Sequence, residues 1–496
     1  MKNIYKTLAL AVAVFSLSAC GNSWLDLDPA TSKPTDKAID DYKSAKEALT
    51  GVYSLLQGNS GSVTYYGANL WVYGDVRGED MQSANLSSRG ASFYSMKYTA
   101  DNAPAIWGTP YKIVRNANNL LAAIADGKVI GATDAQINEL KAEALALRGL
   151  VHFDLCRIYG EPYTVNEGAS LGVPIVLSPL PVAALETRAT VAEVYAQVIQ
   201  DLEESLTLGG LKKEKYYGYV NYWYVKGLLS KVYLYKGEND KSLEYAEDII
   251  KNSPYELWTN EEYVDGWQTT NTGRKEMLFE IVNYSTDNWT DREGIANLMH
   301  PKGYADIIAT KAFITMMGAT PDDVRNGLFL EKNPEDTNPV IGDSKVFVNK
   351  YPANEAGEWR LNSLPVMRIS EVYLFAAEAA AKLNQPATAA KYLNAIHKRA
   401  NPDAADVDAA DATLERISLE RRKELIGEGS RFFDAMRNNE TVIRYTSESD
   451  RGFHPSLDPE ARKFNRTYYK TLLPIPISET NVNAPIRGQQ NPGYGK

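Results

Sequence analysis

Two stretches of the sequence combine aromatic rings with polar side chains, the residue types that hold sugars. An aromatic ring offers a flat apolar face to C–H groups, while carboxylate, amide and guanidinium groups hydrogen-bond to hydroxyls. We take both stretches as candidate ligand contacts, although core packing explains any single member equally well. The first contains Tyr66, Trp71, Arg77, Asp80, Arg89, Phe93 and Tyr94, and the second contains Trp267, Asn288 and Trp289.

Motifs of catalysis are missing from the sequence. There is no Gly-x-Ser-x-Gly elbow, no His-Glu-x-x-His and no phosphate-binding loop that ends in Gly-Lys-Ser/Thr. Charged residues are densest over 420–428, where helical spacing predicts ion pairs along an exposed or interlocking face. We therefore expect no catalytic residue, no cofactor and no enzymatic activity.

The N-terminus carries a cysteine in a setting that favours lipidation. Lys2 and Lys6 precede an apolar stretch over 8–15, and small residues lead into Cys20. A basic start, a short apolar core and a small-residue cleavage site are typical of a secretory signal, and the cysteine makes it similar to a bacterial lipoprotein signal. The sequence predicts that residues 1–19 are removed and that Cys20 anchors the chain to a membrane. A secretory signal with a chance cysteine is the alternative.

The remaining candidates for reactive or metal-binding chemistry are weak. Once Cys20 is lipidated, Cys156 stands alone in an apolar helical stretch, which indicates a buried small side chain and no internal disulfide. Four scattered histidines and one cysteine do not make a zinc site. The aspartates over 402–411 miss the calcium-loop spacing, so we expect no metal.

Composition limits the classes of partner. The net charge is −10, and loss of residues 1–19 removes two lysines and no acids, giving −12. A chain this acidic does not favour nucleic acid or docking on an anionic surface. The 31 tyrosines and 8 tryptophans against 12 phenylalanines lean toward recognition, because Tyr and Trp combine an apolar face with a polar edge.

Helical periodicity places these residues in a mainly α architecture. A helix is predicted over 41–57, and residues 58–106 are predicted as loops and short irregular pieces. Thr133 with Gln136, and Thr190 with Glu193, are capping boxes that predict the starts of two further helices.

Two later segments share one layout, a helix, a short turn, a second helix and then a proline. The first pairs 221–236 with 241–251, and the second pairs 368–383 with 387–399. Alanines at the crossing points make these pairs similar to tetratricopeptide-type repeats, which stack into a solenoid.

The remaining segments complete the expected organisation. Residues 255–365 read as a loop-rich excursion, and the prolines over 473–494 predict an extended tail. The predicted divisions are a signal peptide (1–19), a lipidated tether (20–40), an N-terminal helical region (41–254), a loop-rich insertion (255–365) and a C-terminal helical region with its tail (366–496).

An ordered set of segments resembles the SusD/RagB-like surface lipoproteins. The sharpest is Glu420-Arg421-Arg422-Lys423-Glu424-Leu425-Ile426-Gly427-Glu428-Gly429-Ser430-Arg431-Phe432-Phe433-Asp434. The segments 473–476 and 490–494 resemble the family's closing signature. In the N-terminal half, 142–148 and 172–175 are similar as well. Together these matches run through nearly the whole mature chain.

The resemblance implies a fold, a location and a partner. It implies about four tetratricopeptide-type helix pairs that cradle an irregular ligand-facing region, tethered at the outer face of an outer membrane. It implies capture of oligosaccharides for a SusC-like, TonB-dependent β-barrel transporter. Peptide capture, as in the RagB branch, is the first alternative. A surface glycoside hydrolase and a tetratricopeptide-type scaffold without a small ligand are the others.

Overall fold

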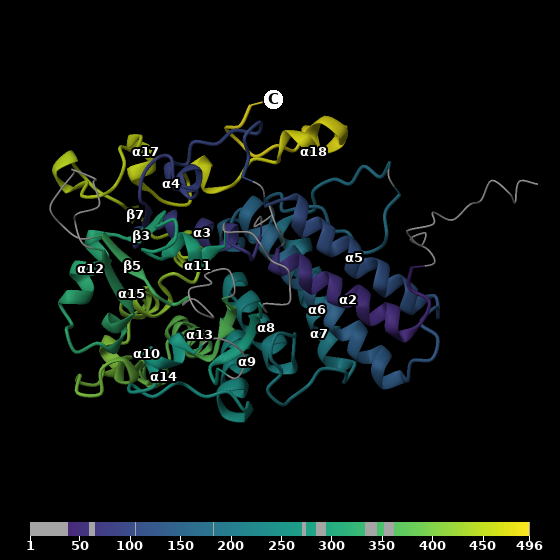
Figure 1. Ribbon diagram of the computed structural model, residues 1–496, viewed down its shortest axis with the longest axis horizontal. Coiled ribbons are helices and arrows are strands. Elements are labelled where there is room, and N and C mark those ends of the chain that lie inside the picture. Colours follow the sequence, from purple (N-terminus) through teal and green to yellow (C-terminus); the bar gives the residue numbers. More distant parts are fainter. Residues whose placement is uncertain are drawn as a thin grey trace, which may run out of the picture.

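The computed structural model describes residues 38–58, 65–104, 106–181, 183–269, 274–283, 294–332, 345–351 and 362–495. The predicted signal peptide, Cys20 and most of the predicted tether lie outside these residues. Helices α2, α5, α6 and α7 lie side by side at one end of the molecule, and α13 and α14 lie toward the other (Figure 1). The C-terminal segments run across the top of this view.

The described chain is helix-rich, as the periodicity predicts. Its α-helices are α2 (Tyr42–Gln57), α3 (Asn69–Val76), α4 (Ala91–Ser95), α5 (Gly108–Ala125), α6 (Asp134–Tyr159), α7 (Val191–Thr207), α8 (Tyr222–Lys236), α9 (Asn239–Asn252), α10 (Tyr263–Gln268), α11 (Ile295–Met299), α12 (Lys311–Gly318), α13 (Ile369–Lys382), α14 (Pro386–Ala400), α15 (Leu414–Leu425), α16 (Arg431–Arg437), α17 (Pro459–Arg462), α18 (Ile477–Val482) and α19 (Ala484–Arg487). Its strands are β1 (Met81–Ser83), β2 (Met277–Ile281), β3 (Ile307–Ala309), β4 (Phe329–Lys332), β5 (Lys345–Val348), β6 (Leu364–Arg368), β7 (Val442–Ile443) and β8 (Lys463–Phe464).

Side-chain caps fix the starts of the long helices. Both predicted capping boxes are present, with Thr133 and Gln136 opening α6 and Thr190 and Glu193 opening α7. Each box satisfies backbone N–H groups that have no partner inside the helix. Asp41 caps α2 in the same way. The start of each of these helices is therefore set by its own sequence.

The two predicted helix–turn–helix pairs are confirmed. Helices α8 and α9 are joined at Gly237, whose positive φ of 89° ends α8 in a left-handed cap. Helix α14 begins at Pro386, a position where the missing N–H has no helical partner anyway. Helix α13 packs against both α14 and α9, so the second pair continues the array begun by the first.

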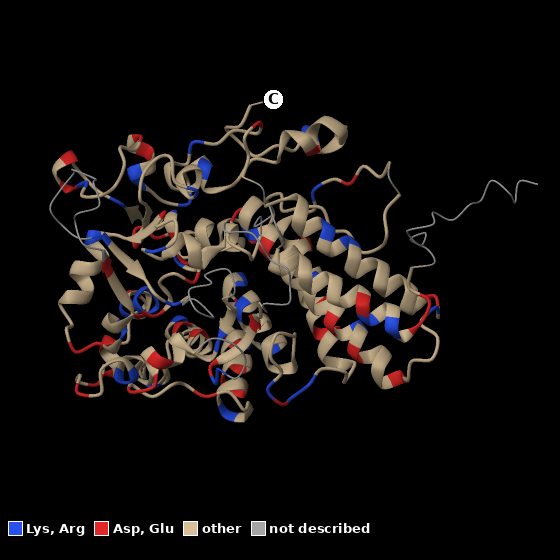
Figure 2. Ribbon diagram, viewed as in Figure 1, with Lys and Arg blue, Asp and Glu red and all other residues tan. Residues whose placement is uncertain are grey.

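The predicted loop-rich insertion contains short paired strands. Antiparallel pairing joins β4 to β5 inside it, β3 to β1 of the N-terminal region, and β2 to β6 at its C-terminal boundary. Strand β2 lies beside β6, which leads directly into α13, so the insertion is tied to the helical array at this edge. Lys, Arg, Asp and Glu are mixed over the helices rather than collected on one face of single sign (Figure 2).

The charged segment over 420–428 is buried, which is deeper than the exposed or interlocking face predicted. Arg368 and Glu424 are both fully buried and lie 3.2 Å apart. Arg399 donates to the same carboxylate at 2.6 Å, and Glu276 accepts from Arg368 at 2.6 Å. Buried charges require partners of this kind. This cluster, the buried ion network, ties α13, α14 and α15 to the turn before β2.

The turn after α15 brings the N-terminal third against the C-terminal helices. A Cβ added at Gly74 would meet the carbonyl oxygen of Gly429 at 1.9 Å, so only glycine permits this approach of α3. The backbone N–H of Gly429 donates to Asp75 at 3.0 Å. Helix α3 lies in the stretch predicted to be irregular, so that prediction was wrong there.

The tail differs from the extended chain predicted for 473–494. It contains the short helices α18 and α19, and in α19 Pro485 occupies the first turn. Proline is tolerated there because a first-turn N–H needs no helical acceptor. Within the described residues, no helix combines the length and apolarity needed to cross a bilayer.

Candidate functional site

A groove with an empty volume of about 800 Å³ opens between α2, the segment that precedes α8, and the end of β2. We call it the tyrosine groove. It is lined by Thr50, Tyr53, Ser54, Gln57, Tyr217, Gly218, Tyr219, Ile281 and Val282.

The aromatic rings of the groove hold one another in place. Tyr219 is 39% exposed and stacks on Tyr216, with ring centroids 4.8 Å apart and planes 20° apart. The ring of Tyr53 meets Tyr219 edge-on at 5.2 Å. Such contacts fix ring orientation before a ligand arrives. The groove therefore presents aromatic faces that need little ordering on binding.

Local sequence explains how these rings reach the groove. Gly218 has a φ of +78°, which turns the chain between Tyr217 and Tyr219. The loop closes where the N–H of Tyr222 donates to the carbonyl of Lys212 at 3.0 Å. Asn221 then caps α8, and its side chain also donates to the carbonyl of Leu278 at 2.6 Å. The loop is thus held against both α8 and β2.

The polar groups among the described lining residues of the groove are uncharged. Gln57 donates to the carbonyl of Val282 at 3.3 Å and so bridges α2 to the end of β2. Ser54 and Thr50 add hydroxyls on the exposed face of α2. Among the described lining residues there is no Asp, Glu, Lys, Arg or His. The groove can stack on apolar faces and hydrogen-bond to hydroxyls, which is the chemistry of sugar recognition.

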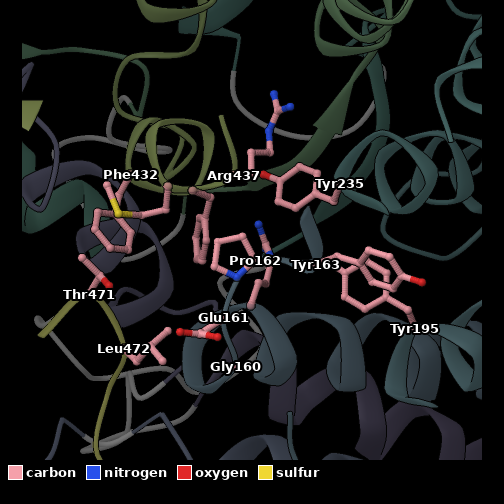
Figure 3. A pocket seen from close by; sticks show the side chains of 13 residues that line it. Gly160, Glu161, Pro162, Tyr163, Tyr195, Tyr235, Phe432, Arg437, Thr471 and Leu472 are labelled. Carbon is pink, nitrogen blue, oxygen red and sulfur yellow. The ribbon is translucent and has the colours of Figure 1, made fainter. Parts of the chain in front are cut away.

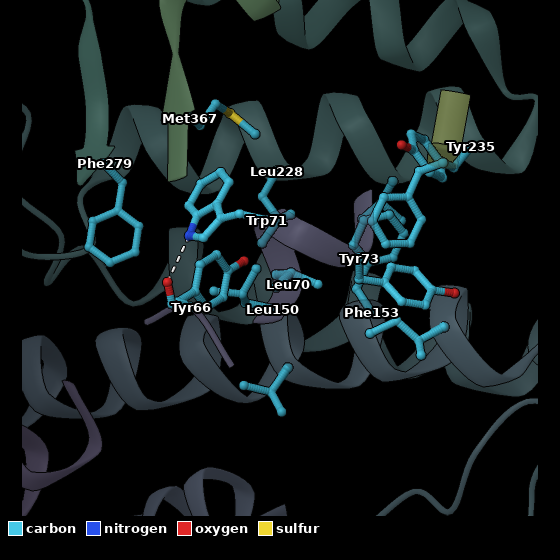
Figure 4. Packing of buried hydrophobic residues seen from close by; sticks show 14 of the residues in the cluster. Tyr66, Leu70, Trp71, Tyr73, Leu150, Phe153, Leu228, Tyr235, Phe279 and Met367 are labelled. Atoms are coloured by element: carbon cyan, nitrogen blue, oxygen red, sulfur yellow. Dashed lines mark hydrogen bonds between the residues drawn. The ribbon is translucent and has the colours of Figure 1, made fainter. Parts of the chain in front are cut away.

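The predicted residues of the first stretch lie elsewhere, mostly in the core. Figure 4 shows Trp71 packed beside Met367, with its indole N–H donating to the carbonyl of Tyr66 at 2.7 Å. Both rings are 4% exposed, so in this structure they support the core. The same holds for Phe93, which is 3% exposed.

The polar members of that stretch make structural contacts. Arg77 is fully buried, with its guanidinium 3.9 Å from the ring centroid of Phe432. Asp80 accepts from Arg422 at 3.0 Å. Tyr94 is fully buried and hydrogen-bonded to His454. These three side chains therefore hold the N-terminal third against the C-terminal segments.

Arg89 is the member of the first stretch that reaches the surface. Its side chain is 37% exposed, pairs with Asp306 at 3.0 Å and stacks 3.4 Å from the ring centroid of Tyr304. It stays a predicted ligand contact, but it is not part of the tyrosine groove.

The second predicted stretch contains one residue that the structure describes and two that it does not. Trp267 is fully buried, and its ring centroid lies 4.8 Å from the guanidinium of Arg368 and 4.9 Å from the Lys350 ammonium. It covers the buried ion network, so its ring has no face free for a sugar in this structure. Asn288 and Trp289 lie outside the described residues and stay predictions.

Sequence reasoning overlooked Tyr217 and Tyr219. Tryptophan-bearing loops drew the predictions, whereas the available signal was a run of three tyrosines around Gly218, just before the capping residue Asn221. Such a run at a turn cannot belong to one face of a helix. Nothing in the sequence indicated that Tyr53 is a candidate ligand contact, because its spacing fits the apolar face of α2.

A second cavity, with an empty volume of about 440 Å³, lies between the end of α6 and α16 (Figure 3). Rings such as Tyr195 and Phe432 line it. Its cations are already engaged, since Arg157 pairs with Asp154 at 2.5 Å and Arg437 pairs with carboxylates of its own.

The remaining thiol is inert in the fold. Cys156 is 1% exposed, and burial raises the pKa of its thiol to about 12. A thiol reacts as its thiolate, so we expect Cys156 to resist a thiol reagent in the folded protein and to react after denaturation. Absorbance with an aromatic disulfide reagent on a Cys20→Ser chain measures this. One equivalent reacting promptly without denaturant would contradict the burial.

No cluster of metal-binding side chains occurs in the described part of the chain.

Comparison of the chain with known proteins shows the family to which it belongs. Residues 181–494 match the SusD family. The chain belongs to the SusD family. Residues 23–234 match a second description, starch-binding associating with outer membrane. The resemblance inferred from the ordered segments is therefore confirmed.

Related SusD proteins share the whole architecture. A SusD superfamily protein from Bacteroides thetaiotaomicron is 36% identical, with a TM-score of 0.84 over 91% of this chain and 100% of its own. A laminarin binding SusD-like protein is 23% identical, with a TM-score of 0.71 over 92% of this chain and 100% of its own. SusD-like protein P25 of Formosa agariphila is 24% identical over 97% of both chains.

Proposed function

We propose that this protein captures uncharged oligosaccharides in the tyrosine groove and does not cleave them. The observation that carries the proposal is the pairing of exposed tyrosine faces with a lining that holds hydroxyl and amide groups but, among described residues, no charge. A uronate or sulfated sugar would have to give up hydration without gaining a cation, which is costly. A neutral sugar has no such cost.

The absence of charge from the described lining also supports binding over catalysis. Glycoside cleavage needs two carboxyl groups that flank the scissile bond, about 5–10 Å apart. Neither face of the described groove supplies such a pair. Binding without turnover fits a groove whose aromatic walls are held before the ligand arrives.

We further propose that the protein is anchored through Cys20 at the outer face of the outer membrane and delivers its sugar to a SusC-like, TonB-dependent β-barrel transporter. The family description that mentions the outer membrane supports the location. The lipoprotein-type signal before Cys20 supports the anchor. In this proposal α8 with α9, and α13 with α14, are two of about four tetratricopeptide-type pairs that present the groove.

A binding panel tests the proposed ligand class. We expect laminarin or starch oligosaccharides to bind with dissociation constants between micromolar and millimolar by calorimetry, and alginate and polygalacturonate oligosaccharides to bind at least 10-fold more weakly. Chromatography after overnight incubation should recover the glycan intact. Binding of mixed peptides alone would favour the peptide-capturing alternative, and binding of uronates alone would contradict the uncharged groove. Absence of binding to every glycan and peptide in the panel would favour the scaffold alternative.

A further inference from the structure

A buried carboxyl group contacts Tyr53 of the tyrosine groove without lining the groove itself. Glu143 lies in α6 and is 3% exposed. It accepts a short hydrogen bond from the hydroxyl of Tyr53. No Lys or Arg lies within ion-pairing distance of this carboxyl among the described residues. A buried carboxyl without a cation is uncommon, because burial penalises its charged form.

Tyr53 passes this contact on to the groove. Its hydroxyl donates to Glu143 and accepts from the backbone N–H of Val220 at 3.0 Å. Val220 directly follows Tyr219 in the chain. One chain of hydrogen bonds therefore runs from α6 through α2 to the loop that carries the exposed rings. With both roles of its hydroxyl used, Tyr53 presents its ring to the groove.

From this chain of contacts we infer that Glu143 is a positioning residue, which holds Tyr53 and Tyr219 in the orientation that a sugar meets. The inference rests on the proposed function of the groove. Glu143 touches no ligand itself, since it is absent from the groove lining. It acts through the ring contact of 5.2 Å between Tyr53 and Tyr219.

The burial of Glu143 changes its protonation state. Burial, aided by Glu139, raises the pKa of its carboxyl to about 8, while Tyr53, Lys212 and Lys46 oppose the rise. Glu139 is itself paired with Lys212 at 3.3 Å. Near pH 6.5 the carboxyl is protonated and holds Tyr53 without charge. Above pH 8 it ionises, and a carboxylate accepts the Tyr53 hydrogen bond more strongly than a neutral carboxyl does, so the hold on Tyr53 persists.

The sign of the stability change follows from the same shift. The folded pKa is raised above the unfolded value, so the unfolded chain releases this proton at lower pH than the folded one. The stabilisation is complete below about pH 4.5 and falls as the pH rises toward 8. A glutamine at this position keeps an acceptor for Tyr53 and removes the titration.

Two variants separate positioning from mere folding. We expect Glu143→Leu to lower the affinity for laminarihexaose or maltohexaose, the neutral probes, about 5- to 10-fold, because the Tyr53 hydroxyl loses its acceptor. Glu143→Gln should retain the affinity of the native protein at pH 6.5. Glu139→Gln, one turn earlier on α6, is the matched control and should bind like the native protein.

A measurement without sugar distinguishes the positioning role of Glu143 from the proposed capture of sugars in the groove. With 3-fluorotyrosine incorporated, the fluorine resonances of Tyr53 and Tyr219 should shift in Glu143→Leu and stay in place in Glu143→Gln. Shifts of this pattern without any glycan binding would support positioning and contradict the proposed function. Unchanged resonances in Glu143→Leu would overturn the role of Glu143.

Discussion

Replacing both Tyr217 and Tyr219 with alanine should weaken capture of a neutral oligosaccharide at least 100-fold. Each ring covers the apolar face of one sugar unit, and loss of one such contact costs about 1.4 kcal/mol, a factor of 10 in affinity. Tyr219→Ala alone should cost about 10-fold. Tyr219→Phe keeps the ring and should bind within about 3-fold of the native protein. Calorimetry with laminarihexaose or maltohexaose measures these changes.

A matched control comes from another exposed tyrosine. Tyr304 is 39% exposed, as is Tyr219, but it stacks on Arg89 and lies outside the groove. Tyr304→Ala should therefore bind normally. If Tyr304→Ala or Arg89→Ala abolished binding while Tyr219→Ala did not, the ligand would sit at the surface predicted from the first aromatic stretch and not in the tyrosine groove.

Replacing Glu424 with leucine should strongly lower the free energy of unfolding. Glu424 is fully buried and pairs with Arg399 at 2.6 Å, Arg368 at 3.2 Å and Arg325 at 3.4 Å. Burial by itself would raise the pKa of this carboxyl, but the surrounding cations, Arg399 first, lower it overall. Glu424→Leu would leave these cations buried without their shared partner, which typically costs about 3–5 kcal/mol.

Thermal unfolding measures this prediction. We expect the midpoint of Glu424→Leu to fall by roughly 5 °C or more, or the protein to fail to accumulate. Glu415→Leu is the matched control, since Glu415 is exposed in the first turn of the same helix, and it should change stability by less than about 1 kcal/mol. Equal behaviour of the two variants would contradict the structural role of the buried ion network.

Local patterns in the sequence account for much of the fold. The capping residues Thr133 and Thr190 predict where α6 and α7 begin, because a cap needs partners only within one turn. The pairing of α13 with α14 follows from apolar periodicity and a short turn. The resemblance of the segment over 420–434 identifies the family, although local pattern alone did not reveal that its charges are buried.

The site was harder to predict because it is built from distant segments. Tyr53, Tyr219 and Val282 meet in the groove although more than 60 residues separate each from the next. No local spacing encodes this meeting. Trp71 and Trp267 show the converse: an aromatic ring in a segment without helical period is predicted to be available for ligands, whereas the fold buries both rings. Burial of a ring depends on contacts far along the chain, which periodicity does not report.

A crystal structure of the protein with maltohexaose or laminarihexaose tests the central claim most directly. We predict sugar rings stacked on Tyr217 and Tyr219, with hydroxyls bonded to side chains such as Gln57, and an unchanged hydrogen bond from Tyr53 to Glu143. An oligosaccharide bound in register against Arg89 and Tyr304, with the tyrosine groove empty, would contradict it.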